Sequence, residues 1–163
     1  MTKHRTFWIR FFLVASLLTA AMIFWFSAQQ GPESQMMSDG VTLQVAPIVR
    51  PDFVSMPAPA RASFLETLSV VVRKCAHFLE YALLGFNLSC LFRLWRESWP
   101  PVAAHGVAWL IATLYAATDE AHQLAVSQRS GALLDVLIDS GGALTGALVA
   151  ALCLLLIERL SAK

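Results

Sequence analysis

Residues able to do chemistry in this chain gather in three short polar segments. They are Arg73, Lys74, His77, Glu80 and Tyr81, then Asp119, Glu120, His122 and Gln123, and finally Arg129, Asp135 and Asp139. Spacings of three and four residues place side chains on one face of a helix, so a helical segment would present its polar groups together. A histidine beside a carboxylate can act as a general base, and lysine or arginine can stabilise negative charge. The three segments are therefore candidates for one binding or catalytic site.

The composition indicates that lipid is the main solvent of the chain. Of its 163 residues, 57% are hydrophobic and 14% are charged, and the net charge is +1. Soluble domains carry about 25% charged residues, so these charges are too few to cover a soluble surface. The near-zero net charge also lacks the basic footprint of a nucleic-acid binder. A soluble enzyme and a nucleic-acid partner are both excluded.

Four apolar stretches are long enough to cross a bilayer, which takes about 20 residues. They cover approximately residues 7–28, 75–95, 101–118 and 132–157. The first is longer than the roughly 7–15 apolar residues of a signal peptide, so we predict an uncleaved anchor. The predicted fold is all-α: a polytopic membrane protein with four transmembrane helices in a compact bundle, forming one domain over residues 1–163.

The connection between the first two spans has a different composition. Residues 29–60 contain five prolines and predict a loop outside the hydrocarbon. Ser63 and Glu66 form a capping-box pattern, and the helical pattern then continues to about Trp95. That helix would be roughly 50 Å long, beyond a core of about 30 Å. Its first turns, as far as Arg73 or Lys74, should therefore form an interfacial helical segment.

Lysine and arginine near the helix ends predict the orientation. The N-terminal cluster and the pair Arg93 and Arg96 favour a cell-membrane protein with both termini in the cytoplasm. The three polar segments then meet at the extracytoplasmic end. Carboxylates at membrane depth are costly, so Asp135 and Asp139 should face the bundle and pair with Lys74, Arg73, Arg129 or a histidine.

Structural roles compete with the functional ones. Arg73 and Lys74 could be interface anchors, Asp119 and Glu120 a solvated helix end, and His77 with Tyr81 a structural pair. Gly142 and Gly146 match a small-xxx-small pattern and are predicted to be packing residues. No cofactor or metal site is predicted, because no fixed metal-ligand spacing occurs and the three cysteines, Cys75, Cys90 and Cys153, stand at unrelated spacings.

Three sequence stretches resemble the signatures of VanZ-like membrane proteins. They are RKCAHFLEYALLG at 73–85, TDEAHQLAVSQRS at 118–130 and DVLIDSGGALTG at 135–146, with FSAQ at 26–29 matching the family's exit from its first helix. The resemblance implies a bacterial multi-pass protein of the cell envelope, and the namesake is associated with low-level teicoplanin resistance. The positions that carry over are Lys74, His77, Glu80, Tyr81, Asp119, Glu120, Gln123, Arg129 and Asp135.

Three functions remain open on these residues. The first is an outer-leaflet site that binds an envelope component or a lipophilic antibiotic. The second is an intramembrane enzyme acting on a lipid-linked envelope precursor, with catalytic candidates His77, Glu80, Asp119 and Glu120. A metal variant of it would use His77, His122, Asp119 and Glu120. The third is a small oligomeric transporter, which ranks last because the inner halves of the spans offer almost no polar residues. Expected partners are membrane lipids, a lipid-linked precursor or a lipoglycopeptide, and the oligomeric state is open.

Overall fold

The computed structural model describes residues 3–29, 31–124 and 133–161, and these are helical almost throughout. Five helices follow one another along the chain: α1 (Lys3–Ser27), α2 (Gly31–Val49), α3 (Ala58–Trp95), α4 (Pro101–Gln123) and α5 (Leu133–Ser161). A single 3-10 turn, η1 (Phe53–Ser55), lies between α2 and α3. The described residues form no strand, so the all-α prediction is confirmed.

Four of the helices, α1, α3, α4 and α5, are long and apolar enough to cross a membrane. Large apolar side chains cover their outer faces, as at Leu17, Leu18 and Leu152, which are all more than half exposed. An apolar outer surface of this extent is stable in lipid and not in water. The prediction of a polytopic membrane bundle is therefore confirmed.

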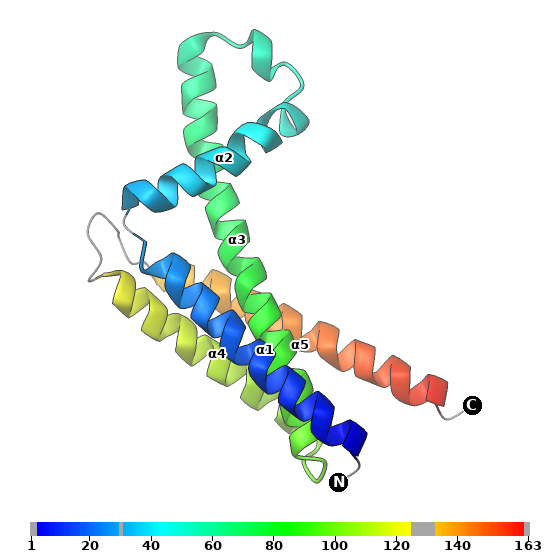
Figure 1. Cartoon of the computed structure of the whole chain (residues 1–163). Helices are drawn as coiled ribbons and strands as arrows, with labels where there is room; N and C mark the ends of the chain where they lie inside the picture. The colour runs from blue at the N-terminus through cyan, green and yellow to red at the C-terminus, as the bar shows by residue number, and fades with distance from the viewer. Residues whose placement is uncertain (1–2, 30, 125–132, 162–163) are drawn as a thin grey trace.

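The long helix α3 organises the bundle, because α1, α2, α4 and α5 all pack against it. Figure 1 shows α1, α4 and α5 gathered around the second half of α3, with both chain ends on the side of the bundle away from α2. Side-chain contacts join the helices at the end of the bundle that holds the chain termini. Arg5 donates hydrogen bonds to the Leu94 carbonyl oxygen at 2.7 and 2.9 Å, and Arg93 pairs with Glu158 at 3.2 Å.

Glycines set the closest helix contact, which lies between α3 and α5. A Cβ atom on Gly142 would clash with the Phe78 carbonyl oxygen, and one on Gly146 with that of Ala82. Gly85 faces the Ala143 backbone in the same way. Small residues let two backbones approach closely in lipid, so the prediction that Gly142 and Gly146 are packing residues is confirmed.

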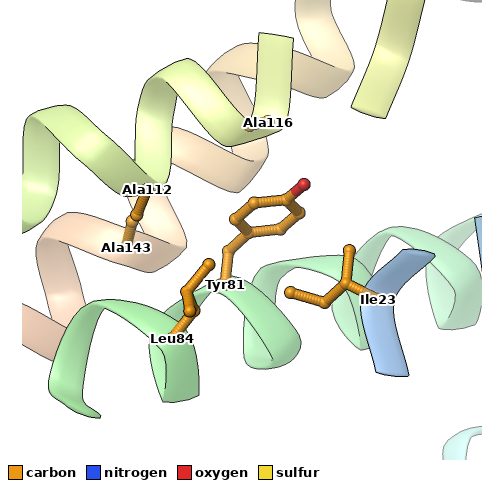
Figure 2. Close-up of a cluster of buried hydrophobic side chains, with 6 residues drawn as sticks. All are labelled: Ile23, Tyr81, Leu84, Ala112, Ala116 and Ala143. Atoms are coloured by element: carbon orange, nitrogen blue, oxygen red, sulfur yellow. The ribbon is translucent and has the colours of Figure 1, made fainter. Parts of the chain in front are cut away.

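The core of the bundle joins all four long helices at one aromatic residue. Figure 2 shows Tyr81 of α3 among Ile23 and Leu84, with Ala112 and Ala116 of α4 and Ala143 of α5 around it. Alanines line the buried face of α4 at every fourth position, and Tyr81 is 0% exposed. Small residues on α4 and α5 thus leave room for one large ring on α3.

The predicted loop over residues 29–60 is wrong, because its first part forms α2. Pro32 lies in the first turn, where no amide donor is needed. Pro47 lies inside the last turn, where it cannot donate the usual hydrogen bond to the carbonyl oxygen of Leu43. Packing on α3 supplies the stabilisation that the composition did not reveal. The buried face of α2 repeats every four residues, at Ser34, Ser38, Thr42 and Ala46.

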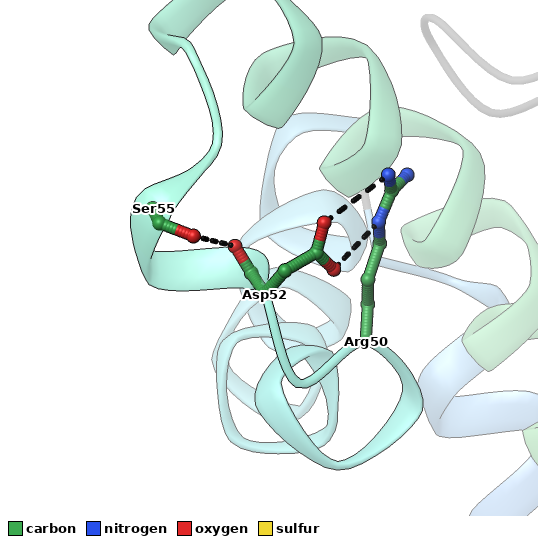
Figure 3. A network of polar contacts seen from close by, with 3 residues as sticks. All are labelled: Arg50, Asp52 and Ser55. Atoms are coloured by element: carbon green, nitrogen blue, oxygen red, sulfur yellow. Dashed lines mark hydrogen bonds and ion pairs between the residues drawn. The ribbon is translucent and has the colours of Figure 1, made fainter.

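After α2 the chain turns back through a small polar network (Figure 3). Arg50 donates to the Asp52 carboxylate at 3.0 and 3.4 Å, and the Ser55 hydroxyl donates to the Asp52 carbonyl oxygen at 2.9 Å. The hydrogen bonds from Arg50 lower the pKa of the exposed Asp52 carboxyl from its ordinary value.

Two predicted helix ends also need correction. Helix α3 begins at Ala58 after Pro57, so Ser63 lies inside the helix and the capping box does not start it. Pro57 stands directly before the helix. Proline is favoured at a helix start because the first amide groups there have no hydrogen-bond partner within the helix. Helix α4 continues beyond the predicted end near residue 118 as far as Gln123, which brings Asp119 and Glu120 into its last turns.

Candidate functional site

Nine polar residues from three helices meet at the end of the bundle that is remote from the chain termini. We call them the polar site. They are Lys74, His77, Glu80 and Tyr81 of α3, Asp119, Glu120 and Gln123 of α4, and Asp135 and Asp139 of α5. Asp139 of α5 lies within electrostatic range of carboxylates on all three helices, namely Glu80, Asp119, Glu120 and Asp135. The predicted convergence of the three polar segments is therefore found among these residues.

An ion pair between Lys74 and Asp135 joins α3 to the first turn of α5. Both side chains are about one-third exposed, so the pair lies at the rim of the polar site. Lys74 was one of four cations expected to pair with Asp135 or Asp139. Carboxylates at this depth need a cation, and Lys74 supplies it for Asp135.

His77 and Glu80 lie one helical turn apart and face each other. The His77 Nδ1 atom is 3.9 Å from the Glu80 Oε2 atom, and both side chains are mostly buried. Asp119 lies within electrostatic range of Glu80. At this distance the two groups can attract each other by charge but do not form a hydrogen bond.

The interior of the polar site is acidic. Asp119, Glu120 and Asp139 are 4%, 7% and 3% exposed, so the alternative of a solvated helix end at Asp119 and Glu120 is wrong. Gln123 donates to Asp119 Oδ2 at 3.2 Å. Three buried polar groups of the site have no hydrogen-bond partner among the described residues. They are the Oδ1 atom of Asp119, the Oδ1 atom of Asp139 and the Tyr81 hydroxyl. Buried polar atoms of this kind are candidates for binding a ligand.

The other predicted residues lie outside this interior. Arg73 is half-buried next to Lys74 and forms no hydrogen bond or ion pair within the described part of the chain. Arg129 falls outside the described residues. His122 stacks on Phe24 of α1, with ring centroids 5.0 Å apart, and His105 is half-buried near the other end of α4. Among residues 3–29, 31–124 and 133–161, no three His, Cys, Asp or Glu side chains are placed to hold a metal ion, so the metal variant has no support there.

Two polar contacts between helices are not predicted from the sequence. The Tyr115 hydroxyl donates to the Ala20 carbonyl oxygen at 2.8 Å, and its ring centroid is 6.2 Å from that of Tyr81. Tyr115 precedes Asp119 by four residues, so helical spacing could have identified it. Asn87 donates to Thr19 at 3.3 Å deeper in the bundle, where no sequence pattern marked it.

These features define a class of protein: a multi-pass membrane bundle with polar side chains of three helices gathered at one end. The family model for VanZ/LLP1 matches residues 12–155, and the chain belongs to this family. The resemblance to VanZ-like proteins is thereby confirmed. Neither a curated protein nor a solved structure matches the chain.

Proposed function

We propose that the polar site lies in the outer leaflet of the cell membrane, with both chain termini in the cytoplasm. Lysine and arginine accumulate on cytoplasmic ends of spans. The end that holds the termini carries Arg5, Arg93 and Arg96, and its two ion pairs reach Glu97 and Glu158. The opposite end carries the buried carboxylates.

We further propose that the site binds the charged head group of an amphiphilic molecule from that leaflet, either an envelope component or a lipophilic glycopeptide antibiotic such as teicoplanin. The observation that carries this proposal is the Lys74–Asp135 pair, about one-third exposed, next to buried carboxylates. A head group can reach the rim from the lipid, where Arg73 and Lys74 favour an anion. An amine can be accepted by the acidic interior. Such binding would let the chain contribute to teicoplanin resistance.

Binding to the purified protein in vesicles tests the proposal. Teicoplanin, vancomycin and the anionic lipid phosphatidylglycerol are titrated separately, so that the antibiotic and lipid arms are distinguished. We expect one amphiphile, teicoplanin or the lipid, to bind. Lys74→Gln should weaken that binding about tenfold or more, because the rim loses the cation that faces the head group.

The matched control is Glu158→Gln, which breaks another α3–α5 ion pair at the opposite end. It should leave binding unchanged. Equal loss in both variants would assign the effect to helix packing, and no binding of any of the three probes would overturn the proposal.

The contact of His77 with Glu80 supports a second candidate, an intramembrane enzyme that acts on a lipid-linked envelope precursor. His77, with the Glu80 carboxylate beside it, would take a proton as general base. Purified protein incubated with such a precursor should convert it, and His77→Ala should abolish the conversion. A precursor recovered unchanged from the parent protein, with and without added divalent metal, would exclude this candidate.

A further inference from the structure

Helix α2 has an apolar edge that no described part of the chain covers. Its buried face, which contains Ser38 and Thr42, packs on α3. Met37, Val41 and Ile48 are 45%, 50% and 80% exposed. At about 100° per residue, these three side chains share one edge, roughly a quarter turn from the buried face.

The opposite edge of α2 points away from the spanning bundle. It carries Asp39 and Leu43, which line a groove together with Leu65 and Glu66 of α3. These α3 residues precede Ser69, which is hydrogen-bonded to Gln35 and Asp39 of α2. Leu65 and Glu66 therefore lie farther from the spanning part of α3. The edge of Met37, Val41 and Ile48 consequently faces the bundle end.

A polar contact fixes this rotation of α2. Asp39 Oδ1 accepts hydrogen bonds from Gln35 at 2.8 Å and from the Ser69 hydroxyl at 3.0 Å, and Gln35 also donates to Ser69 at 2.9 Å. Ser69 is 2% exposed. The acidic side chain is thus held on the edge remote from the bundle.

The position of α2 along α3 places it at the membrane surface. Ser69 precedes the rim residue Lys74 by five residues, which is about 7.5 Å along a helix axis. The head-group layer on each side of a bilayer is roughly 5–8 Å thick. Helix α1 ends at Ser27 and α2 begins at Gly31, so the connection to the span is short. Figure 1 shows α2 lying across α3 and not along it.

We propose that α2 is an interfacial helix that inserts Met37, Val41 and Ile48 into the lipid on the polar-site side of the bilayer. The edge with Asp39 then faces water, as in helices that lie in a membrane plane. The partner of this surface is the lipid bilayer itself. The inference depends on the membrane bundle and is independent of any ligand of the polar site.

Spin-label accessibility tests the proposal. Cys75, Cys90 and Cys153 are replaced by alanine, and one cysteine is introduced by Val41→Cys or by Leu43→Cys. The two positions are matched controls: they are 50% and 55% exposed, and they point about 200° apart around the helix. Met37→Cys and Met36→Cys form a second pair, in case one substitution prevents folding. The full chain is reconstituted in vesicles of phosphatidylcholine and phosphatidylglycerol.

Collision of the label with oxygen reports lipid, and collision with a water-soluble nickel chelate reports water. We expect severalfold more oxygen than nickel collision at position 41 relative to position 43, and the same order for 37 relative to 36. Equal accessibility at the two members of each pair, in lipid or in water, would overturn the proposal, and so would the reverse order.

Discussion

Lys74 of α3 forms an ion pair with Asp135 of α5, near the end of this helix pair that is remote from the chain termini. Both side chains of this pair are about one-third exposed. The carboxylates of Asp119 and Asp139 in the same site are buried. Arg93 and Glu158 join the same helices at the other end. The two pairs therefore allow the polar site to be separated experimentally from the packing of α3 on α5.

Coupling between Lys74 and Asp135 should exceed that between Arg93 and Glu158. Glu158 is 59% exposed, so solvent screens its attraction to Arg93 more strongly. We expect a double-mutant cycle with Lys74→Gln and Asp135→Asn to give about 1 kcal/mol, and the cycle at the other end a smaller value. Unfolding in detergent measures both, and equal couplings would contradict the rim position of Lys74.

Gly146→Ala should destabilise the bundle. The added methyl group would clash with the Ala82 carbonyl oxygen. Because this oxygen belongs to the backbone, it cannot move away without a cost in energy. We therefore expect a loss of about 1–3 kcal/mol in the free energy of unfolding. Gly106→Ala is the matched control, because nothing lies within 4 Å of its Cβ position. Alanine there should raise stability by up to about 1 kcal/mol. Unfolding in detergent measures the stability of both variants. A Gly146→Ala variant as stable as the parent would refute this packing.

The two tyrosines near the polar site should respond differently to loss of the hydroxyl. Tyr115→Phe removes a 2.8 Å hydrogen bond to Ala20 and should cost about 1 kcal/mol of stability. Tyr81→Phe removes a hydroxyl without a partner among the described residues, so stability should hold while ligand binding falls. Thermal unfolding and binding, measured on each variant, separate the two roles. A Tyr81→Phe protein that binds normally would remove Tyr81 from the site.

The Asp52 carboxyl should titrate below its ordinary value. Arg50 favours the ionised form, so the stabilisation is present above the ordinary pKa and is lost as the pH falls through the lowered pKa of the folded protein. Carboxyl NMR shifts follow this titration directly. Arg50→Gln should return the pKa of Asp52 to its ordinary range, and an unchanged titration would show that Arg50 does not cause the shift.

The sequence predicts the parts of this fold that hydrophobic length and small residues control. Long apolar stretches predict α1, α3, α4 and α5, and the spacing of Gly142 and Gly146 predicts close packing. Helix α2 could not be predicted in the same way, because it depends on packing against α3, as in the contacts of Gln35 and Asp39 with Ser69. Its prolines, judged locally, favour a loop.

The polar site follows the same division. Antiparallel spans bring residues at the same end of three helices together, so the convergence of Glu80, Asp119 and Asp139 can be predicted from topology alone. The rotation of each helix about its axis decides which cation pairs with Asp135. It also decides that His122 stacks on Phe24. A sequence without an alignment does not determine that rotation.

Protection of living cells is the most direct test of the claim that the polar site is functional. The parent chain and its His77→Ala, Asp119→Asn, Asp135→Asn and Glu158→Gln variants are expressed at matched membrane levels in a susceptible Gram-positive host. We expect the parent and Glu158→Gln to raise the inhibitory concentration of teicoplanin but not of vancomycin, and the three site variants to lose that protection. Full protection by the site variants would contradict the account.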